Sequence, residues 1–137
     1  TSRGDTLLVN GIDIVEVPRI RRISVQYGSR FLNWIYTPLE IDYCRGRAQQ
    51  LASRFAGKEA MMKALGTGIR GIPWRDIEII RQRGKPPIIQ LHRKAAKRAK
   101  DLGISSIALS LSHSKEYAIA SVVCESTNSN TLPSKTK

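Results

Sequence analysis

The sequence predicts an α+β fold, in which a largely antiparallel sheet packs against a long helix. Two observations lead to this prediction. Residues 106–114 (SIALSLSHS) and 116–125 (EYAIASVVCE) alternate apolar and polar side chains, which is typical of the two strands of a hairpin. Residues 39–65 instead carry apolar side chains at helical spacing. The glycines at 66 and 68 end this helix, because glycine readily adopts the left-handed conformation of a C-cap.

The elements before the long helix are a strand and a shorter helix. The strand spans residues 7–15 (LLVNGIDIV), which are rich in branched apolar side chains. A helical stripe follows, with apolar residues at 17, 20, 23, 27, 31 and 34, and Gly28 is a point where it could bend or break. TPLE (37–40) then has the pattern of a capping box. We expect it to start the long helix, with a possible break at Gly46.

Two short strands and a basic helix complete the pattern. DIEIIRQ (76–82) and PIIQL (87–91) predict strands on either side of a turn. HRKAAKRAKDLG (92–103) predicts a basic helix. We therefore expect one domain over residues 1–125 and a disordered polar tail over residues 126–137.

Charge is the unusual feature of the composition. The 137 residues include 23 Lys and Arg against 11 Asp and Glu, a formal net charge of +12. This excess favours an anionic partner, which could be a nucleic acid, a phosphorylated ligand, an acidic protein or a membrane surface. No apolar run approaches the roughly 20 residues of a membrane span. Cys44 and Cys124 form no CxxC motif, so we expect reduced structural thiols and a cytoplasmic location.

Two acids interrupt apolar surroundings. Asp13 lies in the first strand, and a helical wheel places Glu59 within the apolar arc of the long helix, beside Lys63. Each has a simple structural explanation: a helical ion pair for Glu59, worth about 0.3–0.5 kcal/mol, and a backbone contact at a strand end for Asp13. Taken together, two carboxylates on separate packed elements suggest Mg²⁺, which commonly binds one or two carboxylates and phosphate oxygens.

Cations surround these acids. Arg54, Lys58 and Lys63 lie on the same helix, followed at once by the GTG turn, and this combination could hold phosphate groups. The GTG turn alone is weak evidence for a phosphate site, because a glycine turn usually only ends a helix. Lys85 in GKP (84–86) and His113 in SLSH also have simpler explanations as turn and hairpin residues.

The motifs together resemble the holo-[acyl-carrier-protein] synthases, the small, single-domain type of 4′-phosphopantetheinyl transferase. The resemblance covers residues 7 to 123 and rests on six segments in order: GIDIVEVPRI (11–20), TPLE (37–40), RFAGKEAMMKALGTGI (54–69), DIEI (76–79), GKP (84–86) and SLSHSKEYAIASVV (110–123). Gly57 departs from the family, which commonly has alanine there.

The resemblance implies an enzyme with the 4′-phosphopantetheinyl transferase fold. It would transfer 4′-phosphopantetheine from coenzyme A to a serine of apo acyl carrier protein and release adenosine 3′,5′-bisphosphate. It implies that Asp13 and Glu59 bind Mg²⁺ and that Lys63 supports the phosphates, so that these three residues are catalytic. The serine proton could pass to a metal-bound water or to Glu59. The residues that match the coenzyme A site are Arg54, Lys58, Gly66, Thr67, Gly68, Lys85, Pro86 and His113.

The resemblance also implies partners. The family is typically a homotrimer with active sites at subunit interfaces. Its carriers are acidic, and Arg19 matches a carrier-binding position, whereas Arg22 is assigned from its place on the helical wheel. The alternative is a small basic nucleic-acid-binding protein, which the net charge and the helix at 92–103 favour. Only 6% of the residues are aromatic, and this alternative leaves Asp13 and Glu59 unexplained, so we expect neither a nucleic acid nor a membrane partner.

Overall fold

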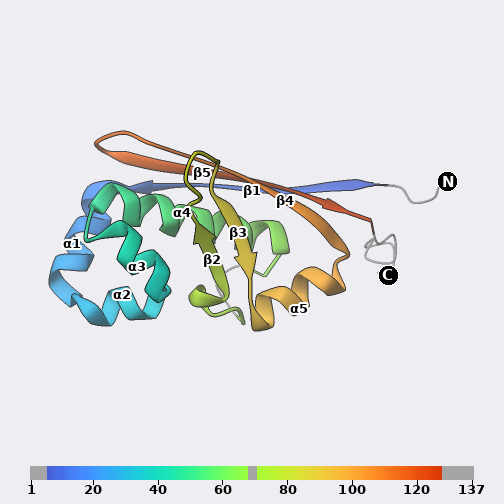
Figure 1. The fold of residues 1–137 in the computed structure, drawn as a ribbon, viewed down its shortest axis with the longest axis horizontal. Coiled ribbons are helices and arrows are strands. Elements are labelled where there is room, and N and C mark those ends of the chain that lie inside the picture. Colours follow the sequence, from blue (N-terminus) through green and yellow to red (C-terminus); the bar gives the residue numbers. More distant parts are fainter. Residues whose placement is uncertain (1–5, 68–70, 128–137) are drawn as a thin grey trace.

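The fold consists of one sheet layer lying along a long helix, with shorter elements around that helix (Figure 1). The computed structural model describes residues 6–67 and 71–127. Its elements are, in order, β1 (Leu7–Glu16), α1 (Val17–Tyr27), α2 (Ser29–Ile35), α3 (Pro38–Cys44), α4 (Ala48–Leu65), the 3-10 helix η1 (Trp74–Asp76), β2 (Ile77–Ile80), β3 (Ile88–Leu91), α5 (Arg93–Asp101), β4 (Ile104–His113) and β5 (Tyr117–Ser126). The predicted α+β fold is confirmed.

The sheets are antiparallel, as predicted. The three-stranded sheet has the order β1-β5-β4, so the predicted hairpin of β4 and β5 forms and β1 pairs with β5 along its full length. In this register Asp13 lies opposite Ala120. The strands β2 and β3 form a separate two-stranded sheet. The strand β1 is therefore an edge strand of this sheet, and no further strand lies beside its free edge within the described residues.

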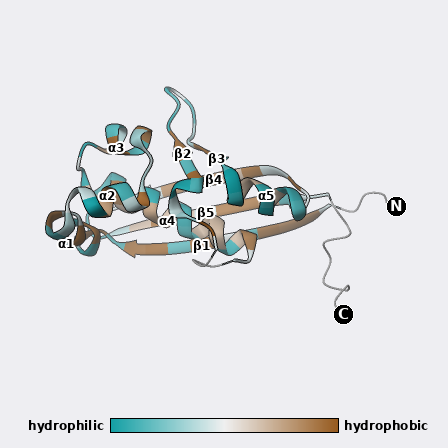
Figure 2. Ribbon diagram, turned by 90° about the horizontal axis from the view of Figure 1, so that it is seen from below, coloured by the Kyte–Doolittle hydropathy of each residue, from teal (hydrophilic) through white to brown (hydrophobic). Residues whose placement is uncertain are grey.

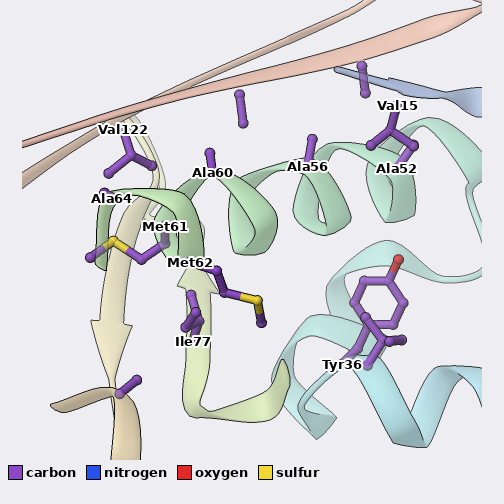
Figure 3. Close-up of a cluster of buried hydrophobic side chains, with 14 of the residues drawn as sticks. Val15, Tyr36, Ala52, Ala56, Ala60, Met61, Met62, Ala64, Ile77 and Val122 are labelled. Carbon is purple, nitrogen blue, oxygen red and sulfur yellow. The ribbon is translucent and has the colours of Figure 1, made fainter. Parts of the chain in front are cut away.

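Small residues on α4 bring the helix close to the three-stranded sheet. Ala52, Ala56 and Ala60 face Val15 of β1 and Val122 of β5 in the core (Figure 3). The approach is closest at Gly11, where an added Cβ atom would lie 2.0 Å from the carbonyl oxygen of Ala60. Glycine is therefore required at this position by the contact between two backbones.

Local signals placed several boundaries correctly. Thr37 and Glu40 form the predicted capping box, because the Thr37 hydroxyl accepts from the Glu40 amide and the Glu40 carboxylate accepts from the Thr37 amide. Gly28 has a φ of +55° and separates α1 from α2. The long helix is broken as well, because residues 45–47 separate α3 from α4.

One boundary was wrong. Ser126, which the sequence assigned to the polar tail, is the last residue of β5, is buried, and donates a hydrogen bond to the Leu102 carbonyl. Thr127, the next residue of the predicted tail, is exposed and donates its backbone amide to the Gly103 carbonyl at 3.0 Å. The remaining residues of the tail, 128–137, lie outside the described residues.

No helix within residues 6–67 and 71–127 is both long enough and apolar enough to cross a bilayer.

Cys44 and Cys124 are both buried, and neither forms a disulfide. This agrees with the prediction of reduced structural thiols.

Candidate active site

An acidic pair forms where β1 passes over α4. Gly11 allows β1 to approach the helix, and Asp13, two residues later on the same face of the strand, meets Glu59. Lys63, one turn after Glu59, donates to the Asp13 Oδ1 atom at 3.0 Å and to the Ile12 carbonyl at 2.9 Å. The three residues with predicted catalytic roles are therefore adjacent.

With both carboxylates ionised, the pair would carry one more negative charge than Lys63 neutralises. The pKa of Glu59 is raised to about 8, chiefly by burial and next by a hydrogen bond to Asp13 and by the negative charge of Asp13. The positive charges of Lys63 and Arg19 lower this pKa in part. The Asp13 Oδ2 atom is buried and has no hydrogen-bond partner within the described part of the chain. In the absence of a cation, Glu59 therefore keeps its proton at neutral pH.

This arrangement fits Mg²⁺ held jointly with a phosphorylated substrate. Within residues 6–67 and 71–127, no group of three or more His, Cys, Asp or Glu side chains could bind a metal ion. The available donors are two carboxylates, one of which has an unpaired buried oxygen. Mg²⁺ is commonly bound by one or two carboxylates together with substrate phosphates, rather than by a complete set of protein ligands.

The placement of Glu59 on the helical wheel was only partly right. Its apolar neighbours Leu51 and Ala52 are buried, but Glu59 itself is half-buried and the Lys63 side chain is 54% exposed. The opposite side of α4 is buried instead, at Arg54, Gly57, Lys58 and Met61. The reason is that α4 is covered on most sides, and its more open positions, Glu59 and Lys63, lie beside Asp13 of the edge strand β1.

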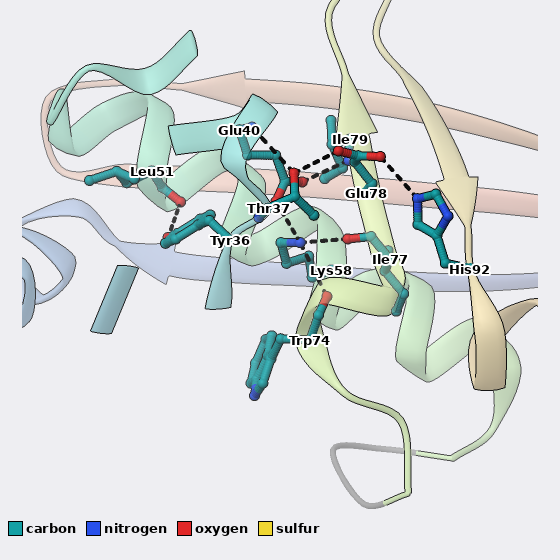
Figure 4. A network of polar contacts seen from close by, with 10 residues as sticks. All are labelled: Tyr36, Thr37, Glu40, Leu51, Lys58, Trp74, Ile77, Glu78, Ile79 and His92. Carbon is teal, nitrogen blue, oxygen red and sulfur yellow. Dashed lines mark hydrogen bonds and ion pairs between the residues drawn. The ribbon is translucent and has the colours of Figure 1, made fainter. Parts of the chain in front are cut away.

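Lys58 has a structural role in this fold, which corrects its assignment to the coenzyme A site. Its side chain has no exposed surface, and its ammonium group forms an ion pair with Glu40 at 2.8 Å. It also donates to the carbonyls of Trp74 and Ile77 (Figure 4). Burial lowers the pKa of Lys58, whereas Glu40 raises it. The sequence could not show this because the partners come from three other elements.

Arg54 is buried as well, but it contacts Tyr43, which lines a cavity. Its guanidinium group lies 4.4 Å from the centroid of the Tyr43 ring, and its Nε atom has no hydrogen-bond partner among the described residues. Tyr43 lines a cavity of about 460 Å³, together with Leu39, Asp42, Arg45, Arg47, Ile79, Ile80 and Arg81. The three exposed arginines of this cavity were not predicted as site residues, since only the overall charge excess indicated them.

The remaining predicted residues are dispersed. Gly66 caps α4 with a φ of 74°, Thr67 is half-buried beside it, and Gly68 lies outside the described residues. Lys85 and Pro86 are exposed in the loop between β2 and β3, and His113 is exposed at the end of β4. Among the described residues, no hydrogen bond or ion pair joins Lys85 or His113 to Asp13 or Glu59.

The first helix brings one cation, Arg19, close to the acidic pair. Arg19 and Arg22 are both exposed on α1, as predicted. Arg19 is close enough to lower the pKa of Glu59. The acidic pair therefore lies next to a positively charged surface.

Comparison with known proteins decides the family. The sequence profile of the 4′-phosphopantetheinyl transferase superfamily matches residues 10–122. The chain belongs to this superfamily. Among curated members, it is 50% identical over 123 residues to the holo-[acyl-carrier-protein] synthase of Koribacter versatilis, which covers 87% of this chain and 98% of the relative. It is 45% identical to the enzyme of the same name from Moorella thermoacetica, over 88% of this chain and 95% of the relative.

Solved structures of the superfamily share the fold. The crystal structure of the Helicobacter pylori holo-[acyl-carrier-protein] synthase in complex with coenzyme A matches with a TM-score of 0.77 at 34% identity. That match covers 84% of this chain and 98% of the Helicobacter pylori chain. The holo-[acyl-carrier-protein] synthase of Neisseria meningitidis matches with the same TM-score at 36% identity, covering 85% of this chain and 96% of that chain. The 4′-phosphopantetheinyl transferase fold predicted from the sequence is confirmed.

Proposed function

We propose that this chain is a holo-[acyl-carrier-protein] synthase. The serine hydroxyl oxygen of an apo acyl carrier protein attacks the phosphorus atom that bears the pantetheine arm of coenzyme A. The P–O bond to the other phosphate of the pyrophosphate breaks, which gives the holo-carrier and adenosine 3′,5′-bisphosphate. The observation that carries this proposal is the acidic pair of Asp13 and Glu59 with Lys63, in a chain that matches the superfamily over residues 10–122.

Asp13 and Glu59 would hold Mg²⁺ in this proposal. When bound, the ion neutralises charge that develops on the pyrophosphate during transfer. Lys63 keeps the Asp13 carboxylate in place through its hydrogen bond to Oδ1, and its exposed ammonium group can also reach a phosphate. The unpaired Oδ2 atom of Asp13 and the raised pKa of Glu59 support the presence of a cation between these two residues.

The nucleotide end of coenzyme A requires further cations. We place it on the predicted residues Arg54, Gly66, Thr67, Gly68, Lys85, Pro86 and His113, without Lys58. Arg54 stacks on Tyr43, which lines the cavity together with Arg45, Arg47 and Arg81. An aromatic ring surrounded by cations suits a phosphorylated nucleotide, because the arginines can bind its phosphate groups.

We further propose that the active protein is a homotrimer in the cytoplasm. Apolar side chains remain exposed on the side of the sheet that faces away from α4, and Figure 2 colours long stretches of β1 and β5 as hydrophobic. Such contiguous apolar surface is unusual on a monomer. These side chains are Leu8, Ile12, Ile14, Tyr117, Ile119 and Val123.

The carrier would bind at α1. Acidic carriers complement Arg19 and Arg22, which are both exposed, and Arg19 is close enough to the acidic pair to lower the pKa of Glu59. Arg19→Glu with Arg22→Glu should raise the Kd for the apo carrier by at least about tenfold, because charge reversal replaces attraction by repulsion. The same double variant should leave the Kd for coenzyme A within about twofold. Lys100→Glu, on the remote helix α5, is the matched control, and equal losses for both ligands would contradict this assignment.

Mass spectrometry of the intact carrier tests the reaction. An apo carrier incubated with this protein, coenzyme A and Mg²⁺ should gain the mass of one phosphopantetheine group, and EDTA should abolish the gain. Asp13→Asn and Glu59→Gln should lose the transfer while circular dichroism shows that they remain folded. Full activity of both variants would overturn the metal assignment, and no transfer by the folded wild-type protein to several carriers would overturn the function.

A further inference from the structure

A second cavity lies away from the acidic pair, between the end of α2, the segment 71–76 and the beginning of α5. It measures about 720 Å³, which is within the range of small-molecule sites. Its apolar wall is formed by Trp34, Ile72, Pro73 and Trp74. These two tryptophans are the only ones in the sequence. None of these residues is used by the proposed transfer reaction.

The rim of this cavity is positively charged. Arg75, Arg93 and Lys94 line it, and all three are exposed. The acid among its described lining residues is Asp76, which is 1% exposed. Asp76 accepts a hydrogen bond from the Lys94 backbone amide at 2.9 Å and pairs with Arg93 at 3.6 Å. The carboxylate is therefore used within the protein, and the solvent side of the rim presents cations.

The cavity is in contact with the catalytic helix. The Trp74 ring stacks on Phe55, with centroids 4.8 Å apart and an angle of 26° between the planes. Phe55 lies on α4 one turn before Glu59. The wall of the cavity is thus a fixed part of the fold, because the Trp74 carbonyl also accepts a hydrogen bond from the buried Lys58.

We propose that this cavity binds an amphipathic anion, namely a single acyl chain that carries a carboxylate or phosphate group. The chain would lie against Trp34, Trp74 and Ile72, and the anionic group would be held by Arg75 and Lys94. This combination follows from charge complementarity, because an uncharged apolar ligand would leave the cationic rim without a partner. The site goes beyond the proposed transferase function, and it does not depend on that function.

Tryptophan fluorescence tests the proposal directly, because both tryptophans of the chain line the cavity. Decanoate, used below its critical micelle concentration, should change the emission of the full-length protein saturably. The matched probe 1-decanol has the same chain without the charge and should bind at least about fivefold more weakly. Lys94→Glu and Lys94→Met should each weaken decanoate binding by at least about fivefold, since both remove an exposed cation. Lys100→Glu, on the same helix but outside this cavity, should leave the Kd within about twofold.

Decanoyl-coenzyme A, with coenzyme A as its match, distinguishes the source of the chain. A signal from decanoate identifies a free acid as the ligand. A signal from decanoyl-coenzyme A alone, with none from decanoate, would contradict the proposal, because a thioester carries no anionic group at the end of its acyl chain.

Other outcomes would overturn the proposal. One is the absence of a saturable fluorescence change with every acyl probe, and another is a Kd for 1-decanol equal to that for decanoate. A loss of affinity in Lys100→Glu equal to that in the Lys94 variants would do the same. So would a fluorescence response to adenosine monophosphate as strong as that to decanoate, or a response seen only with anionic phospholipid vesicles. Carrier modification is measured separately by mass, so a failure here is distinguishable from a failure of the transferase assignment.

Discussion

Glu59 is a residue whose ionisation the fold opposes and a bound cation would favour. Its pKa is raised to about 8, with burial as the largest cause and Asp13 as the next. The folded chain therefore binds more protons than the unfolded chain between the ordinary pKa of about 4.5 and this raised value. The contribution of Glu59 to stability is complete below the lower value and is lost as the pH rises through 8.

This leads to a prediction about pH. In EDTA, the free energy of unfolding of the wild-type protein should fall between about pH 5 and pH 8.5 relative to that of Glu59→Gln, which cannot ionise. Mg²⁺ should reduce the fall, because the cation stabilises the ionised pair. Urea denaturation at several pH values, with and without Mg²⁺, measures both effects. Parallel curves for the two proteins in EDTA would contradict the raised pKa.

Residue types and spacing predicted some site residues better than others. The proximity of Asp13, Glu59 and Lys63 could be expected because a strand and a helix present them in local motifs, whereas their catalytic roles stay a prediction. Lys58 could not, since a lysine beside a catalytic motif has the same local pattern whether it faces a ligand or a buried Glu40 from α3. The cavity arginines Arg45 and Arg81 come from segments that only the folded chain brings together.

At the scale of elements, the buried pair of Lys58 and Glu40 joins α4 to α3 and to β2. Glu40 also accepts a hydrogen bond from the Ile79 amide at 2.7 Å. Glu78 extends the network, because it accepts from the Thr37 hydroxyl at 2.6 Å and contacts His92 at 2.9 Å (Figure 4). The side chains of Lys58 and Glu40 are both without exposed surface, so the loss of one would leave the other charge buried and unpaired.

Substitution of the two α4 lysines, Lys58 and Lys63, should therefore have different effects on stability. Lys58→Met should destabilise the protein by about 3–5 kcal/mol, the usual cost of removing one partner of a buried pair. Lys63→Met should change stability by less than about 1 kcal/mol, because that side chain is largely exposed, but it should weaken coenzyme A binding. Urea denaturation and calorimetric titration measure the two effects, and equal stability losses would refute the distinction.

The contact between β1 and α4 predicts a steric effect. Gly11→Ala would place a Cβ atom 2.0 Å from the Ala60 carbonyl oxygen, and neither backbone can move away easily. We expect a destabilisation of about 1–3 kcal/mol or more, as in overpacked cores. We also expect a loss of transfer, because Asp13 would be displaced from Glu59. Asn10→Ala, at the exposed neighbouring position, should do neither; thermal unfolding and the mass assay would show whether this is so.

The elements themselves were largely predictable because each has a local signal. Alternation identified β4 and β5, Thr37 and Glu40 identified the start of α3, and Gly28 marked the break after α1. The burial of α4 on most of its sides was not predictable, since it depends on the packing of β2 and the other helices around it. Gly57 illustrates this, because a Cβ atom there would lie 2.4 Å from the Ile79 side chain of β2.

At the scale of the whole molecule, the exposed apolar face of the sheet predicts assembly. Ile12→Glu or Ile119→Glu should convert the proposed trimer into monomers, because each would bury an unpaired carboxylate in the interface. Val25→Glu, at a residue of α1 that is 80% exposed, is the control and should leave the mass unchanged. Light scattering coupled to size-exclusion chromatography measures the mass, and a wild-type monomer at micromolar concentration would refute the assembly.

The pairing of β1 with β5 also places the start of the first strand beside the end of the last strand. Leu7 lies opposite Ser126, so the two ends of the sheet meet at the end of the molecule away from α1, as Figure 1 shows. A circular permutant that joins these ends through a short linker would therefore keep every strand in its present register. New termini in the exposed loop between β2 and β3 would leave the acidic pair and the helix that holds it in one continuous segment.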